Sequence, residues 1–95
     1  MRQYETMYIV NPSLEAEQTA EVIQRYQAIV TDKGGQIDEL QEIGKRRLAY
    51  EIDGHREGYY VLMKFTCDTE TPKEIERLMR IDDNVIRYLT VRVGE

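Results

Sequence analysis

The sequence is poor in the residues that build metal and redox sites. Among 95 residues it has no tryptophan, two prolines, one histidine and one cysteine. The single cysteine, Cys67, cannot form an internal disulfide, and one histidine leaves no Cys/His cluster for a structural zinc ion. We therefore expect no metal and no cofactor.

Long hydrophobic runs are also missing. The longest apolar stretches, such as residues 59–63, are far too short to cross a bilayer. The amino terminus lacks the basic segment followed by an apolar segment that marks a signal sequence. These absences predict a cytoplasmic protein without a membrane partner.

The residue arrangements typical of enzymes are absent from the sequence. There is no nucleophile beside a base, no glycine-rich phosphate cradle and no inward-facing pair of carboxylates. His55 falls in a polar segment, and Asp82-Asp83 is typical of a turn after a helix. We expect no catalytic residue and no small-molecule substrate.

Negative charge is in excess, and a formal net charge of −5 by itself argues against nucleic-acid binding. The charges are nevertheless segregated, because residues 43–66 carry five basic and three acidic side chains, whereas residues 1–42 carry three and eight. Arginine outnumbers lysine nine to four, and a guanidinium suits bidentate contacts with phosphate. The basic middle indicates either an anion-binding segment or a surface of salt-bridged arginines.

The hydrophobic pattern predicts four strands and two helices. Aromatic and β-branched runs predict the strands, and apolar residues at helical spacing predict the helices. Ser13 is expected to cap the first helix, and the Thr71-Pro72-Lys73-Glu74 capping box is expected to start the second. Gly44 should mark a bulge in the second strand. The expected order is strand 2–10, helix to about 33, strand 37–52, a turn-rich connection 53–58, strand 59–66, helix 71–81 and strand 85–93.

This βαββαβ order predicts one domain, residues 1–95, with an α+β ferredoxin-like fold. In that arrangement a four-stranded antiparallel sheet carries both helices on one face. The first and third strands are apolar on both sides, with Tyr4 and Tyr8 opposed to Met7, and Val61 opposed to Leu62. Either the open face meets a partner, or these central-strand residues are half shielded by their neighbours.

Residues 44–52, Gly-Lys-Arg-Arg-Leu-Ala-Tyr-Glu-Ile, place three adjacent cations between a glycine and an aromatic strand end. Such a cluster suits a phosphate backbone, or protects an edge strand from pairing with other chains. The segment resembles the signature of the family of small ribosomal subunit protein six. Residues 1–5 with 11–12, residues 58–60 and residues 80–85 resemble the same family in order and spacing, so that the match covers essentially the whole chain.

The resemblance implies a structural constituent of the small ribosomal subunit. Such a protein joins small-subunit ribosomal protein eighteen, and the pair binds the central domain of small-subunit ribosomal RNA. A basic partner would supply electrostatic attraction that an acidic protein lacks. The RNA-binding residues carried over by position are Arg2, Arg46, Arg47, Arg80, Arg87 and Arg92, with Arg56 as a further addition. The partner interface is expected at Tyr50, Tyr59, Tyr60 and Leu62, although each tyrosine also fits a core position.

Three alternatives remain open at this point. An RNA recognition motif has the same element order and reads single-stranded RNA by itself, and residues 7–11 come close to its first-strand motif. Residues 57–61 depart from its third-strand motif, because Glu57 stands where a cation is expected before the glycine. A ferredoxin-like ligand-binding regulator and a homodimer joined through open sheet faces are the other two.

Overall fold

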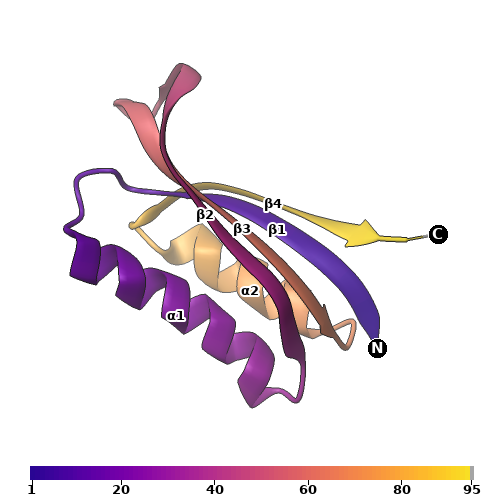
Figure 1. Ribbon diagram of the computed structural model, residues 1–95. Coiled ribbons are helices and arrows are strands. Elements are labelled where there is room, and N and C mark those ends of the chain that lie inside the picture. The colour runs from indigo at the N-terminus through magenta and orange to yellow at the C-terminus, as the bar shows by residue number, and fades with distance from the viewer. Residues whose placement is uncertain (95) are drawn as a thin grey trace.

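The computed structural model describes residues 1–94, so Glu95, the last residue of the expected single domain, lies outside the described residues. Four strands form one antiparallel sheet in the order β2-β3-β1-β4, and both helices cover the same face of it (Figure 1). The ferredoxin-like α+β prediction is confirmed. Among residues 1–94 no helix is both long and apolar enough to span a membrane. The elements are β1 (Arg2–Val10), α1 (Ala16–Asp32), β2 (Gln36–Ile52), β3 (His55–Cys67), α2 (Thr71–Ile81) and β4 (Val85–Val93).

The hydrophobic core lies between the helices and the sheet. Successive side chains of a strand point to opposite faces, so alternate residues of β1 and β3 point toward the helices. Tyr8 and Tyr26 meet there with ring centroids 5.7 Å apart, which joins the centre of β1 to α1. The buried side chains of this layer are Tyr4, Tyr8, Val10, Val22, Ile23, Tyr26, Val30, Val61, Met63, Phe65, Cys67, Ile75, Met79 and Val85.

Neither helix is capped by the residue expected from the sequence. The backbone N–H of Ser13 donates to Asn11 Oδ1 over 2.9 Å, so Ser13 belongs to a turn and α1 starts only at Ala16. At α2, Asp68 Oδ1 accepts hydrogen bonds from the Thr71 backbone N–H (2.8 Å) and hydroxyl (2.7 Å). The expectation that Ser13 and Thr71 are caps is wrong. The residue before α1 is Glu15, whose backbone N–H donates to Gln18 Oε1 over 3.1 Å, and Thr71 is already the first residue of α2.

The hairpin between β2 and β3 is longer than expected. Only Asp53 and Gly54 form the turn, with φ of 49° and 82°, the pair of positive φ values that a tight two-residue hairpin requires. The predicted loop 53–58 is therefore wrong for residues 55–58, which belong to β3. The pairing register shifts between Glu42 and Gly44, which confirms the bulge at Gly44.

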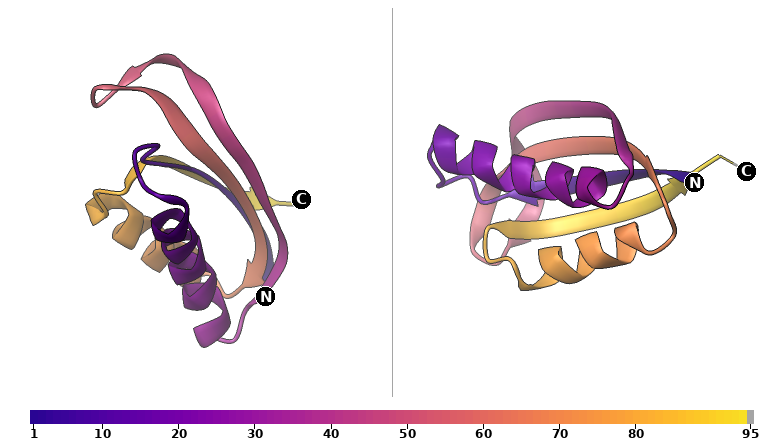
Figure 2. Two further views of the ribbon diagram at one scale, coloured as in Figure 1. Left: turned by 60° about the vertical axis from the view of Figure 1, so that its left-hand side comes forward. Right: turned by 90° about the horizontal axis from the view of Figure 1, so that it is seen from below.

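Residues 45–58 form a hairpin arm that continues beyond the rest of the sheet. The pairing of β1 with β3 ends at Val10 and Tyr59, so the arm has only its own two strands to pair. Figure 2 shows this ribbon curving past the end of the helical layer. The arm therefore presents side chains on two faces, neither of which rests on a helix.

Candidate functional site

The open face of the sheet carries four rows of side chains that run across the strands. Directly opposed residues of antiparallel strands point to the same side, so the register identifies each row. The face changes from aromatic and cationic beside the hairpin arm, through apolar, to mixed charged and polar at the other end. In that order the rows are Gly44, Tyr60, Ile9 and Arg87; Gln41, Leu62, Met7 and Leu89; Glu39, Lys64, Glu5 and Val91; Gln36, Thr66, Gln3 and Val93.

An apolar strip crosses this face and widens along β4. Met7 and Leu62, on the central strands, are half-buried by their neighbours, whereas Leu89 is 64% exposed on the edge strand. Val91 and Val93 follow at alternate positions and are also exposed. Shielding by neighbours, one of the two alternatives for this face, therefore holds for the centre of the sheet, whereas the β4 edge leaves apolar surface uncovered. We define the apolar strip as Met7, Leu62, Leu89, Val91 and Val93.

The partner interface expected from the sequence did not include the β4 part of this strip. The signal was present, because Leu89, Val91 and Val93 repeat with the period of two that puts them on one face of a strand. Their side could not be assigned until Leu89 was seen opposite Met7.

Tyr50 and Arg87 meet where the hairpin arm approaches β4. Arg87 Nη1 donates a hydrogen bond of 2.6 Å to Tyr50 Oη, and the guanidinium carbon lies 5.6 Å from the centroid of the tyrosine ring. Tyr50 is nevertheless 61% exposed. Arg46 lies opposite Gly58, on the same face as Ile9, and Leu48 is buried in the part of β2 where the pairing register shifts. The arm end of the open face thus combines an exposed aromatic ring with two cations.

These two cations are not neutralised by carboxylates. Within residues 1–94, neither Arg46 nor Arg87 forms an ion pair with an acidic side chain. Arg46 Nη1 donates instead to the backbone carbonyl of Lys45 over 2.9 Å. Arg56, at the tip of the arm, does lie near a carboxylate, 3.8 Å from Glu51. Arg46 and Arg87 therefore keep their charge available for an anion.

The other predicted arginines lie elsewhere, so the six do not form one patch. Arg47 lies opposite Glu57 in the register of β2 and β3. It lines a hollow of about 580 Å³ beside Pro12, on the helix side of the arm. Arg80 is exposed in the last turn of α2. The remaining two, Arg2 and Arg92, sit opposite Cys67 and Tyr4 at the end of the sheet away from the arm.

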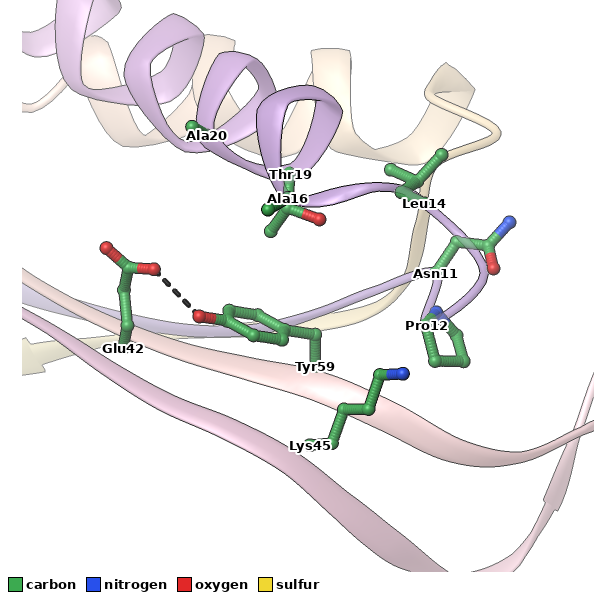
Figure 3. Close-up of a pocket in the computed structure, with 9 residues that line it drawn as sticks. All are labelled: Asn11, Pro12, Leu14, Ala16, Thr19, Ala20, Glu42, Lys45 and Tyr59. Atoms are coloured by element: carbon green, nitrogen blue, oxygen red, sulfur yellow. Dashed lines mark hydrogen bonds between the residues drawn. The ribbon is translucent and has the colours of Figure 1, made fainter.

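Tyr59 lies apart from the other predicted interface residues. Tyr60 and Leu62 occupy adjacent rows of the open face, but Tyr59 points to the helix side, where its hydroxyl donates to Glu42 Oε1 over 2.8 Å. This hydrogen bond to a carboxylate raises the pKa of Tyr59. Figure 3 shows the ring in a cleft of about 320 Å³ between the start of α1 and strands β2 and β3, lined by Asn11, Pro12, Leu14, Ala16, Thr19, Ala20, Glu42, Lys45 and Tyr59.

The described residues offer no arrangement suited to catalysis or metal binding. No group of three or more His, Cys, Asp or Glu side chains in residues 1–94 is placed to hold a metal ion. Burial raises the pKa of the Cys67 thiol to about 11, so at neutral pH it is protonated and a poor nucleophile.

Comparisons with known proteins agree on one family. The family model described as ribosomal protein S6 matches residues 3–92. A protein of Carboxydothermus hydrogenoformans, small ribosomal subunit protein bS6, is 47% identical over 92 residues, which cover 97% of this chain and 96% of the relative. Its counterpart in Halalkalibacterium halodurans is 48% identical over the full length of both chains. The crystal structure of 30S ribosomal protein S6 from Thermotoga maritima superposes with a TM-score of 0.91 at 33% identity, covering 97% of this chain and 87% of that one.

Proposed function

Since the chain belongs to the ribosomal protein S6 family, we propose that it binds central-domain ribosomal RNA jointly with small-subunit protein eighteen. Members of this family are structural, non-enzymatic constituents of the small ribosomal subunit in the cytoplasm. In this proposal the chain acts there as one domain, residues 1–95. The observation that carries the proposal is the division of the open face. An apolar strip suits a protein partner, and the uncompensated cations beside it suit a phosphate backbone.

The apolar strip is the part of the face that fits protein eighteen. Soluble proteins rarely leave a continuous apolar surface uncovered, and Leu89, Val91 and Val93 form one along an edge strand. Leu62 and Tyr60, both predicted for this interface, lie in the strip and in the row beside it. A protein partner seated here would also cover the free backbone groups of β4.

The cations beside the strip fit the RNA. Arg46 and Arg87 lie at the arm end of the same face, so a partner on the strip and RNA on the arm would be adjacent. The net charge of −5 weakens any attraction to RNA by this chain alone, because phosphate binding depends on released counterions. The proposal therefore requires the partner to contribute positive charge. Four further arginines stay predicted RNA contacts, although they do not lie at the arm end of the open face: Arg2, Arg47, Arg80 and Arg92.

The test is binding of a central-domain RNA fragment to this protein, with and without protein eighteen, at two salt concentrations. We expect tight and salt-sensitive binding only when the partner is present. Binding of short single-stranded RNA by this chain alone would instead support the RNA recognition motif alternative. Binding of neither RNA with or without the partner would overturn the proposal.

A pair of variants tests whether protein eighteen binds the apolar strip. Leu89→Lys puts a charge at a position that is 64% exposed, so the fold should tolerate it, and we expect binding of protein eighteen to be lost. Ile81→Lys is the matched control, because Ile81 is 67% exposed but lies on α2, in the helical layer. Equal binding by the two variants would show that the strip does not receive the partner.

A further inference from the structure

We infer that Tyr50 and Arg87 form a subsite for one unpaired nucleotide, whose base stacks on the Tyr50 ring while Arg87 contacts its phosphate. The inference rests on the proposed function, since it names how RNA is received at the arm end of the open face. It goes beyond that function by assigning a ligand group, a single nucleobase, to one side chain.

The ring of Tyr50 is the one tyrosine surface that is available for stacking. Of the seven tyrosines, Tyr4, Tyr8 and Tyr26 are buried and Tyr59, Tyr60 and Tyr88 are half-buried, whereas Tyr50 is 61% exposed. Base stacking is the sequence-tolerant way in which RNA-binding proteins use exposed aromatic rings.

The ring is also held in position before any ligand arrives. Its hydroxyl accepts the 2.6 Å hydrogen bond from Arg87, and the Arg87 guanidinium carbon lies 5.6 Å from the ring centroid. These two contacts fix the ring relative to β4, 37 residues away in the chain. Preorganisation of this kind lowers the ordering cost of binding.

The electrostatic surroundings fit the phosphate of the same nucleotide. A guanidinium has five N–H donors, and the hydrogen bond to Tyr50 occupies one of those on Arg87. Arg46 lies on the open face of the arm, opposite Gly58, and neither arginine is paired with a carboxylate. An anion beside the ring would therefore meet the available cation of Arg87, with a second one, Arg46, on the same face of the arm.

The base must be unpaired, because a base within a duplex exposes its edge but not its face. The competing explanation is that the Tyr50–Arg87 contact only fastens the arm to β4. The two explanations differ in which part of Tyr50 matters: stacking uses the ring, and fastening uses the hydroxyl.

Three variants in complex with protein eighteen separate these explanations by their affinity for the central-domain RNA fragment. Tyr50→Leu removes the ring and should weaken binding about 5- to 150-fold, the range measured for loss of one stacked base. Tyr50→Phe keeps the ring and removes the hydroxyl, and should bind within about threefold of the unaltered protein, a change too small for loss of a stacked base. Arg87→Ala should reduce the slope of the logarithm of RNA affinity against the logarithm of salt concentration by about one, because one phosphate contact is lost. Arg77→Ala is the matched control, because Arg77 pairs with Glu74 on α2 and should leave the slope unchanged.

Each outcome has one meaning. If the unaltered pair binds RNA and Tyr50→Leu binds equally well, the subsite is refuted and the proposed function stands. If Tyr50→Phe is as weak as Tyr50→Leu, fastening of the arm explains the effect and the subsite is again refuted. If the unaltered pair fails to bind RNA, the proposed function itself fails. Thermal unfolding of each variant excludes loss of the fold as the cause.

Discussion

Gly58 offers the sharpest test of how the sheet is packed. It is buried on β3, and a β-carbon added there would overlap Cγ2 of Ile9 on β1. Ile9 is itself only 6% exposed and cannot move aside easily. Overpacking of this kind costs about 1–3 kcal/mol. Loss of glycine's freedom in the unfolded chain offsets about 0.4–1 kcal/mol of that cost. We expect Gly58→Ala to lower the free energy of unfolding by about 1–2 kcal/mol.

A double-mutant cycle with Ile9→Ala isolates the overlap. Ile9→Ala alone should cost about 2–5 kcal/mol, because it truncates a buried side chain. It also removes the atom that the new β-carbon would meet, so the double variant should be more stable than the sum of the single effects by about 1 kcal/mol or more. Urea unfolding followed by circular dichroism gives all four values. Additive effects, or a Gly58→Ala variant as stable as the original chain, would refute the reasoning.

Three further predictions concern single contacts. Asp68→Ala should lower the melting temperature at pH 7, because the Asp68 carboxylate accepts the hydrogen bonds of Thr71; these bonds hold the folded-state pKa of Asp68 below its usual value. The stability that these bonds contribute is present above the unfolded-state pKa of about 3.9 and is lost as the pH falls through the lower folded-state pKa. The melting temperatures of the variant and the parent should therefore converge in acid. A difference that stays constant with pH would contradict the assignment. Tyr26→Phe should cost about 1.5–3 kcal/mol in urea unfolding, because the hydroxyl donates to the Asp82 carboxylate over 2.6 Å; a cost below 0.5 kcal/mol would show that the bond contributes little. Cys67, buried with a pKa near 11, should react with iodoacetamide at pH 8 only as fast as the chain unfolds, and rapid labelling of the folded protein would disprove its burial.

The order of elements and the fold class could be predicted because each element has its own period in the sequence. The strand bounds at residues 2–10 and 85–93 match the structure, since both runs alternate and end in turn residues. The apolar character on both sides of β1 and β3 also indicated apolar residues on the open face. How far they extend across the sheet depends on the strand register, which a single sequence does not contain.

The hairpin arm could not be predicted, and the reason is physical. A strand pattern is visible where one face is buried, but residues 55–58 lie in the arm, which has no helix below it. Polar residues on both faces therefore had the composition of a loop. In α1, Ala16 and Ala20 also have the helical spacing of core residues, yet they are exposed and line the cleft of Figure 3, whereas Val22 is buried.

The candidate site was predictable in composition but not in arrangement. Arg46 and Arg87 were both named from the sequence, yet nothing in it indicated that they share a face while Arg47 points to the other side. The contact between Arg87 and Tyr50 joins residues far apart in the chain, and it exists only because the arm curves toward β4. Assignment of all six arginines to RNA stays a prediction.

The arm's separation from the helices has a consequence for how the protein opens. Amide hydrogens at the centre of the sheet, around Val61 and Met63, exchange with solvent only when the buried core is disrupted. Those of residues 45–58 are held by a two-stranded ribbon, which opens at a much lower free energy while the remainder stays folded. The chain therefore has two groups of amides that differ in their protection from exchange. A ligand that binds the arm raises the free energy of the local opening, so slower exchange at residues 45–58 would report binding there.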